Sequence, residues 1–271
     1  MSLASVTGYD ETFLGSTLPL SLPRPLGDEE LRELGYPRFT VLLDPVRRLA
    51  AVTAVNIDGS SLQDLPRTGE WMLDPRLPAS EQTGPAVYAD NDLDRGHLVR
   101  RRDPGWGTAD QAREATEATF SYTNAAPQAG VFNQSKDLWL GLEDHVLHYA
   151  DTTDQRISVF TAPVLDPGDP VYRGVGIPRR FYKVAAWVTE GGLQAAGFVL
   201  DQSELIDAAQ GAVAVRPLGA FRTFQVPIAE IETLAGIDFG LLVDADVLAQ
   251  PGVRGGDEWR PLRAAADIVL G

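Results

Sequence analysis

The residues best suited to chemistry lie in one short stretch of the chain. It reads Asp-Arg-Gly-His over 94–97 and continues to three consecutive arginines at 100–102. Histidine is the side chain whose unperturbed pKa best suits a general base near neutral pH. Gly96 is expected to permit unusual backbone angles and the close approach of a substrate. The stretch therefore offers a candidate base, His97, beside arginines that could neutralise a phosphate.

A second polar block follows, and it supplies oxygen ligands. It comprises Tyr122-Thr-Asn-Ala-Ala-Pro-Gln128, then Phe132-Asn-Gln134, then Trp139-Leu-Gly-Leu-Glu-Asp144. Amide and carboxylate oxygens are typical ligands of hard divalent cations. Phosphodiester hydrolysis needs an activated water, a neutraliser for the nonbridging oxygens and help for the leaving alkoxide. Together the two blocks indicate a metal-dependent phosphodiesterase site.

The remaining histidines have two interpretations. The chain holds three histidines, and two of them, His145 and His148, stand beside Glu143 and Asp144. A carboxylate–histidine metal cluster is one interpretation. Packing in the last turns of a helix, where the dipole favours a histidine, is the other and the more favoured one.

The arginine run and the neighbouring tryptophan also have two interpretations each. Residues 100–102 either line a substrate groove or form a solvated patch paired with nearby acids. Those acids would be Asp103, Asp110 and Glu114. Trp106 either stacks on a base or buries its ring, and burial is favoured.

Composition sets limits on the class of protein. The chain has 271 residues, 44% of them hydrophobic, no cysteine and a formal net charge of −15. It is long enough for a sizeable core, and it can form neither a disulfide nor a thiolate metal site. The acidic total counts against extensive phosphate binding, but an acidic body with one basic cleft can still hold a polyanion.

No export or membrane segment is readable in the chain as given. No apolar run approaches the roughly 20 residues that span a bilayer. The first ten residues have neither a basic start nor an apolar stretch of the kind found in signal peptides. The sequence therefore leaves the cellular location unknown.

The patterns predict one α+β domain over 1–271 with a central antiparallel sheet and flanking helices. Residues 1–37 are expected to form an extended arm laid over the core. Hairpins are predicted for 39–43 with 49–57 and for 181–189 with 193–200, and further strands for 86–89, 120–123 and 157–163. Helices are predicted for 28–34, 109–118, 135–150, 228–235 and 257–269, the second with Thr108 as its N-cap. Residues 165–178 are expected to be a loop.

The order of these motifs resembles the DNA/RNA non-specific endonuclease family, the ββα-metal nucleases. The shared elements are Asp94-Arg-Gly-His97, Asn124-Ala-Ala-Pro-Gln128, Asn133-Gln134 and Leu142-Glu143. The first element alone arises by chance fairly often, whereas four elements in the right order are highly specific. The resemblance extends over most of the chain and implies a ββα-metal active-site motif.

The resemblance also implies roles for particular residues. His97 would be the general base that takes a proton from water, and Arg95 would contact the phosphate or brace the cleft. Asn124 would orient the site. Asn133 would be the protein ligand of Mg²⁺ or Mn²⁺, and Arg67 would correspond to a region that supplies a transition-state arginine in some members.

Glu143 would support the hydration shell of the metal, but its spacing departs from the family. It stands ten positions after Asn133, which would be about 15 Å along a continuous helix. The conflict eases if Asn133 lies in a loop before the helix. Asp137 is the alternative carboxylate, and the sequence leaves the choice open.

The sequence thus predicts a sugar-non-specific endonuclease that cleaves DNA and RNA and leaves 5′-phosphate and 3′-hydroxyl ends. The first alternative is an inactivated relative that binds nucleic acid without cutting it. The second is a phosphodiesterase acting on a small or lipid-linked phosphodiester. The resemblance admits an inhibitor protein and a homodimer as further partners, and secreted or periplasmic location is frequent in the family.

Overall fold

A computed structural model describes residues 8–130, 154–209, 212–215, 222–250, 259–263 and 267–270. Its main feature is an eight-stranded sheet in which every neighbouring pair is antiparallel. In spatial order the strands are β16 (Arg260–Leu262), β14 (Arg222–Gln225), β11 (Gly192–Asp201), β10 (Arg180–Thr189), β7 (Arg156–Pro163), β4 (Leu49–Asp58), β3 (Phe39–Asp44) and β2 (Arg32–Tyr36).

Two-stranded sheets and short helices complete the described fold. The paired strands are β1 (Arg24–Pro25) with β15 (Ile237–Asp238), β5 (Leu93–His97) with β6 (Ala125–Ala129), β8 (Val171–Tyr172) with β9 (Val175–Gly176), and β12 (Ile206–Ala209) with β13 (Ala212–Val215). The α-helices are α1 (Pro85–Tyr88), α2 (Ala109–Ala118), α5 (Ile228–Ala235) and α6 (Leu241–Asp244). Short 3₁₀ turns include η2 (Ala79–Glu81) and η3 (Tyr122–Asn124).

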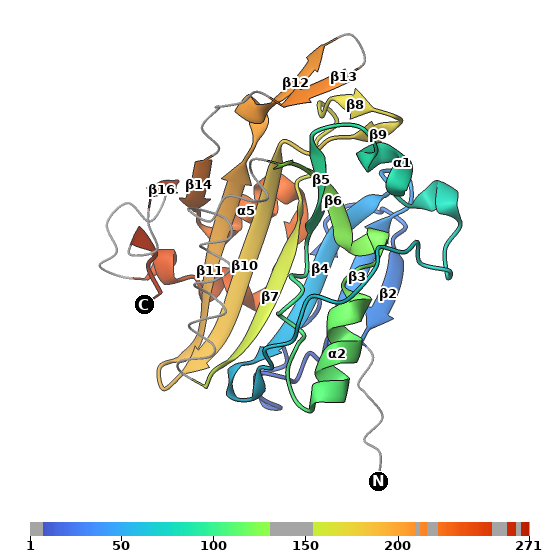
Figure 1. Ribbon diagram of the computed structural model, residues 1–271. Coiled ribbons are helices and arrows are strands. Elements are labelled where there is room, and N and C mark those ends of the chain that lie inside the picture. Colours follow the sequence, from blue (N-terminus) through green and yellow to red (C-terminus); the bar gives the residue numbers. More distant parts are fainter. Residues whose placement is uncertain are drawn as a thin grey trace.

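Both faces of the large sheet are covered, and each carries its own apolar core. Along β4 the residues therefore do not alternate between apolar and polar, and nine of its ten positions are buried. One core includes Val55 and Val159 with Leu93 and Ala126 of the β5–β6 pair. The other packs Ile228 and its neighbours in α5 against the opposite face. Figure 1 shows β5, β6 and α2 in front of the sheet.

Most of the long elements were correctly predicted. The two hairpins are β3–β4 and β10–β11, and the strand at 157–163 is β7. Helix α2 has the predicted bounds, because Thr108 accepts a bond from the backbone N–H of Gln111 in a capping box. Helix α5 begins after Pro227 and ends at Gly236, whose φ of +65° suits glycine.

Several shorter predictions were wrong because tertiary pairing outweighs local preference. Residues 28–34 form no helix, since Arg32–Tyr36 is edge strand β2 of the large sheet, and the extended arm therefore ends before it. The strand predicted at 86–89 is helix α1, which Pro85 begins at a position where its missing N–H costs nothing. Residues 257–269 were predicted to be helical, but Arg260–Leu262 is strand β16.

Two further predictions missed short elements. The expected loop at 165–178 contains the β8–β9 pair. The strand predicted at 120–123 begins later, at Ala125, and runs through Pro127. Proline is tolerated there because β6 pairs only with β5 among the described strands, so Pro127 can sit on an edge where its missing N–H breaks no ladder.

Candidate active site

The motif at 94–97 forms most of strand β5, which pairs with β6 across a short antiparallel register. Gly96 lies opposite Ala126, and His97 lies opposite Ala125. Because side chains alternate along a strand, Arg95 and His97 project from the same face of β5. The two side chains with the clearest chemistry are therefore neighbours by backbone geometry alone.

Gly96 is required for a packing reason and not for the unusual backbone angles that were expected. Its φ lies outside the positive region, and the residue is buried within β5. A Cβ at this position would collide with Cδ and Oε1 of Gln128, a side chain that is itself only 1% exposed. The glycine is needed because Gln128 occupies the space where a side chain would lie. Among the described residues, neither amide atom of Gln128 has a hydrogen-bond partner.

Asn124 braces the chain that leaves His97. Its side-chain Oδ1 accepts from the backbone N–H of Val99 at 2.8 Å, and its Nδ2 donates to the Val99 carbonyl at 2.9 Å. Nδ2 also donates to the Thr119 carbonyl at 3.0 Å. The side chain is fully buried, so these bonds are formed away from water and fix the end of β5 against η3.

Gln202 fixes the other side of the strand pair. Its Oε1 accepts from the backbone N–H of Ala129 at 3.0 Å, and its Nε2 donates to the carbonyls of Pro127 and Pro178. This buried amide therefore ties β6 to the segment that leads into β10. This contact could not be predicted from the sequence, since it joins residues more than seventy positions apart.

Aromatic rings enclose the imidazole of His97. The ring centroid of Trp71 lies 4.5 Å from that of His97, and the centroid of Phe120 lies 5.0 Å away at nearly a right angle. Trp71 also contacts Phe120 and Tyr122, at 5.5 and 5.7 Å. His97 is consequently half-buried, and its Nε2 is a buried atom without a hydrogen-bond partner in the described part of the chain.

Burial and positive charge both oppose protonation of this imidazole. Desolvation is the larger cause, and the charges of Arg67, Arg101 and Arg95 add to it in that order. Together they lower the pKa of His97 to about 3. The histidine is therefore neutral at physiological pH.

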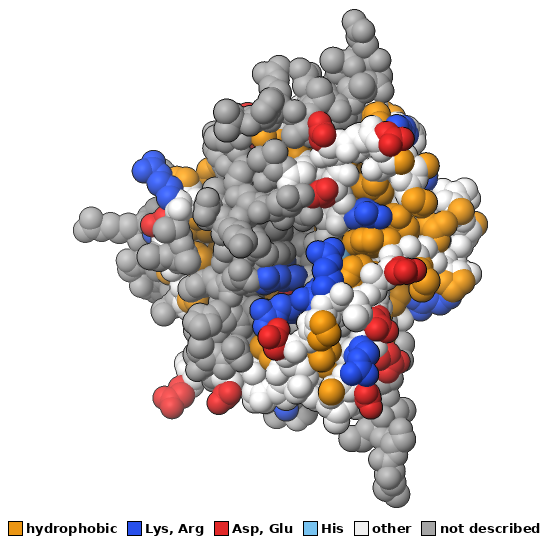
Figure 2. Space-filling model, viewed as in Figure 1, with side chains coloured by type: hydrophobic (Ala, Val, Ile, Leu, Met, Phe, Trp, Pro, Cys, Tyr) orange, Lys and Arg blue, Asp and Glu red, His pale blue; other side chains and the backbone are white. Residues whose placement is uncertain are grey.

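The arginines around His97 come from three parts of the chain. Arg67 and Arg95 are exposed, whereas Arg101 is half-buried and donates to the carbonyls of Leu65 and Pro66 at 3.1 and 3.4 Å. Desolvation, followed by repulsion from Arg67 and the adjoining arginines, lowers the pKa of Arg101. Figure 2 shows several basic side chains close together near the middle of the face in view.

The printed ion pairs bear on part of the paired-patch interpretation of the arginine run. Arg102 lies 4.0 Å from Asp64, and Asp110 pairs with Arg113 at 2.9 Å. The packing interpretation of Trp106 is confirmed, because its ring lies 3.8 Å beneath the Arg38 guanidinium and its Nε1 donates to a backbone carbonyl.

Arg67 and Trp71 reach the site on one segment, residues 67–76, which we call the strap. The backbone N–H of Met72 donates to the Phe120 carbonyl at 3.0 Å, and the Tyr122 N–H donates to the Met72 carbonyl at 2.9 Å. Gly69, with a φ of +133°, packs directly on the Phe120 ring. These contacts hold the strap along the edge of η3.

A buried polar network fixes the far end of the strap. The Tyr36 hydroxyl donates to Asp74 at 2.5 Å and contacts the Thr123 hydroxyl at 2.6 Å. Burial alone would raise the pKa of Asp74, but hydrogen bonds from Arg76 and Tyr36 lower it below its usual value. Gln82 pairs through its amide with both the N–H and the carbonyl of Asp74.

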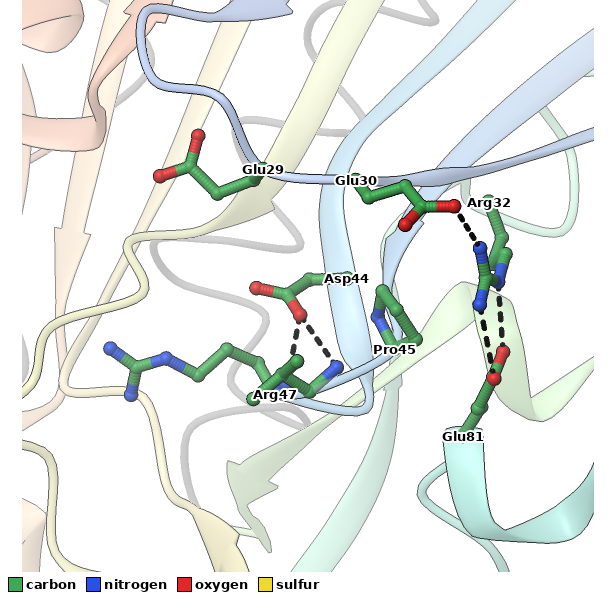
Figure 3. A pocket seen from close by; sticks show the side chains of 8 residues that line it. Glu29, Glu30, Arg32, Asp44, Pro45, Arg47 and Glu81 are labelled. Atoms are coloured by element: carbon green, nitrogen blue, oxygen red, sulfur yellow. Dashed lines mark hydrogen bonds and ion pairs between the residues drawn. The ribbon is translucent and has the colours of Figure 1, made fainter.

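A separate pocket of about 540 Å³ lies at the β3–β4 turn. Figure 3 shows Glu30, Arg32 and Glu81 joined by hydrogen bonds, and Asp44 accepting from the backbone of its own turn. Four carboxylates line this pocket against two arginines, so it repels a polyanion. The pocket is therefore a less suitable binding site for a polyanion than the basic surroundings of His97.

Several predicted site residues lie outside the described residues. These are Asn133, Asp137, Glu143, His145 and His148, with the predicted helix at 135–150. Within the described part of the chain, no three or more His, Cys, Asp or Glu side chains are grouped so as to hold a metal ion. The described helices include none that is long and apolar enough to cross a membrane.

The structure brings together His97, Arg95, Arg67 and Asn124 from the predicted set. Sequence reasoning missed the contact of Trp71 with His97 and the aromatic enclosure by Phe120 and Tyr122. The available signal was that Arg67, Trp71 and Asp74 stand close together in the sequence.

Comparison with known proteins identifies the family of the chain. The model of the DNA/RNA non-specific endonuclease family matches residues 25–246. The chain is 36% identical over 288 residues to the uncharacterized protein y4fB of Sinorhizobium fredii (strain NBRC 101917 / NGR234), covering 96% of this chain and 42% of the relative. The chain thus spans less than half the length of that relative.

The fold is also similar to that of EndoG, solved in its complex with EndoGI in a study of EndoG inhibition. The TM-score is 0.58 at 20% sequence identity, covering 79% of this chain and 86% of that one. At this identity the likeness concerns the fold. The family match spans most of the chain, and the chain therefore belongs to the DNA/RNA non-specific endonuclease family.

Proposed function

We propose that the chain is a metal-dependent, sugar-non-specific endonuclease that hydrolyses phosphodiester bonds of DNA and RNA. The observation that carries the proposal is the state of His97. Its Nε2 is a buried, unpartnered atom among the described residues, in an imidazole whose pKa is lowered to about 3. A neutral imidazole beside three arginines suits removal of a proton from water next to a bound phosphate.

In the proposed reaction, water attacks phosphorus while Nε2 of His97 takes its proton. The bond from phosphorus to the 3′ oxygen breaks, and the leaving oxygen takes a proton from solvent, which gives a 5′-phosphate and a 3′-hydroxyl end. Arg95 projects from the same strand face as His97, and Arg67 is close enough to lower its pKa. Both guanidiniums are exposed and can offset the charge that grows on the nonbridging oxygens. Asn124 keeps the end of β5 in place.

The proposed metal is Mg²⁺ or Mn²⁺, held by Asn133 with support from Glu143 or, alternatively, Asp137. This donor set consists of oxygens only, which fits a hard divalent cation that retains much of its hydration. When bound, the ion would stabilise negative charge on the phosphate and on the leaving oxygen. An inhibitor protein is a further partner that the proposal admits, because the similar EndoG structure was solved with EndoGI.

Incubation with supercoiled plasmid and with single-stranded RNA tests this function. We expect nicked and linear plasmid and shortened RNA in Mg²⁺ or Mn²⁺, and intact substrates in EDTA. End-labelling should find 5′-phosphates. An Asn133→Ala variant should lose cleavage with an unchanged circular dichroism spectrum.

The same assay separates the alternatives. Gel-shift binding of plasmid without cleavage in any divalent metal would support the inactivated relative. Hydrolysis of bis(p-nitrophenyl) phosphate with intact plasmid and RNA would support a phosphodiesterase for small substrates. Either result contradicts the proposed endonuclease.

A further inference from the structure

Trp71 contacts both of the side chains that β5 presents to the site. Its ring centroid lies 4.5 Å from that of the His97 imidazole, with the planes tilted by 46°. The guanidinium carbon of Arg95 lies 5.7 Å from the centroid of the Trp71 ring, within the range of a cation–π interaction. One indole ring therefore lies within interaction distance of both the candidate base and an exposed arginine.

The position of this ring is itself fixed from several directions. It contacts Phe120 and Tyr122, which are only 3% and 4% exposed. The next residue, Met72, is joined to the same two residues by two backbone hydrogen bonds. Asp74, three positions after Trp71, is buried and hydrogen-bonded to Tyr36. Trp71 is thus immobilised on a wall of buried aromatic rings rather than on a free loop.

Simple core packing does not account for this arrangement. Trp71 is only half-buried, and its neighbours Glu70 and Met72 are exposed. The apolar cores on the two sheet faces do not include it. A large ring held at the surface against an imidazole and a guanidinium restricts the rotamers of both, which lowers the entropy lost when a substrate orders them.

We propose that Trp71 is a positioning residue, a platform that holds His97 and Arg95 side by side for water activation and phosphate binding. This role rests on the proposed function, because only a nuclease needs the two side chains aligned for water activation and phosphate binding. The indole ring acts through His97 and Arg95, so it does not itself take part in proton transfer. Loss of the ring should disturb the geometry of catalysis more than the affinity for nucleic acid.

The first test needs neither metal nor substrate. Proton NMR of the metal-free protein can observe the imidazole signals, and because the chain has three histidines, a His97→Gln variant identifies those of His97. The ring current of an indole 4.5 Å away shifts these signals, and the shift is upfield for protons that lie over the indole face. We expect Trp71→Ala and Trp71→Leu to lose the shift, Trp71→Phe to keep part of it, and Met72→Ala to leave it unchanged. Met72 is the matched control, since it lies on the strap and is 67% exposed.

The second test separates kcat from KM in plasmid cleavage. A misplacement of about 1 Å can cost on the order of 100-fold in rate, so we expect Trp71→Ala and Trp71→Leu to lower kcat by roughly 10- to 100-fold. KM should change little. Trp71→Phe should restore most of kcat. The leucine variant preserves apolar volume if the alanine variant fails to fold.

Unchanged His97 signals in a folded Trp71→Leu protein would contradict the proposal that Trp71 positions the imidazole. A rise in KM with unchanged kcat would also overturn it, because that pattern denotes a ring that binds nucleobases directly. If the wild-type protein cleaves no nucleic acid, the proposed function fails, while the NMR result still decides whether Trp71 positions His97.

Discussion

Burial and neighbouring positive charge both lower the pKa of His97. The unfolded chain would protonate this imidazole near pH 6.5, whereas the folded pKa is about 3. A depressed pKa means that the neutral base survives as the pH falls below 6.5. It also means that folding becomes less favourable over the range from about 6.5 to about 3, where only the unfolded state takes up the proton.

The pH dependence of kcat/KM tests this assignment. We expect the acid limb that belongs to His97 to lie well below pH 6.5, because a protonated imidazole cannot act as a base. Removing positive charge with Arg67→Ala should raise that limb toward higher pH. Arg113→Ala is the matched control, since Arg113 pairs with Asp110 on α2 and is absent from the charges that act on His97. An acid limb near 6.5 that no arginine variant moves would contradict this electrostatic account.

The pairing of strands β5 and β6 determines what surrounds each residue of the motif at 94–97. The motif could be located in the sequence, but the expectation for Gly96 rested on the backbone freedom of glycine. The true cause lies on the other strand, where Gln128 fills the space above the glycine. Contacts between strands depend on register, which a single sequence does not reveal when the strands are short.

A double-mutant cycle measures this packing. Gly96→Ala should lower the free energy of unfolding by about 1–3 kcal/mol, because the new methyl group overpacks a buried site. Gln128→Ala opens the space, so the double variant should be more stable than the sum of the single changes predicts. Urea denaturation of the four proteins provides the values. Strict additivity would show that the two residues do not compete for the same space.

The elements predictable from the sequence were those whose signals are local. Helix α2 carries its own capping box, and β10 and β11 are long apolar runs around Gly191-Gly192. The segment at 28–34 has a helical composition, but pairing with β3 makes part of it a strand. Likewise, the motif identified His97 and Arg95, whereas Trp71 and Gln202 join the site through contacts distant in sequence.

On the scale of the whole molecule, we propose that residues 1–271 form one domain. Its two apolar cores lie on opposite faces of the same strands. Unfolding of either core would therefore disrupt the sheet that both cores share. We expect differential scanning calorimetry to give one transition whose calorimetric and van't Hoff enthalpies agree. Two resolved transitions would show that the cores unfold independently.

The acidic composition bears on the proposed binding of nucleic acid. Because the net charge is −15, we expect that binding to rely on the arginines near His97. If three of them contact phosphates, the slope of log K against log salt should be about −2 to −3, at roughly −0.7 to −0.9 per phosphate. Arg67→Ala in a His97→Ala background should flatten the slope by about 1, and Arg113→Ala should leave it unchanged. A slope that Arg67→Ala does not alter would remove Arg67 from the substrate interface.

We propose that His97 on β5 is the base that activates water. The most direct test of this proposal is plasmid cleavage by His97→Ala beside wild type at saturating Mg²⁺, with circular dichroism confirming that both proteins are folded. A positioned general base contributes about 10²–10⁴-fold, and we predict a loss of kcat of that size with little change in KM. A folded His97→Ala protein that cleaves plasmid at the wild-type rate would contradict the account.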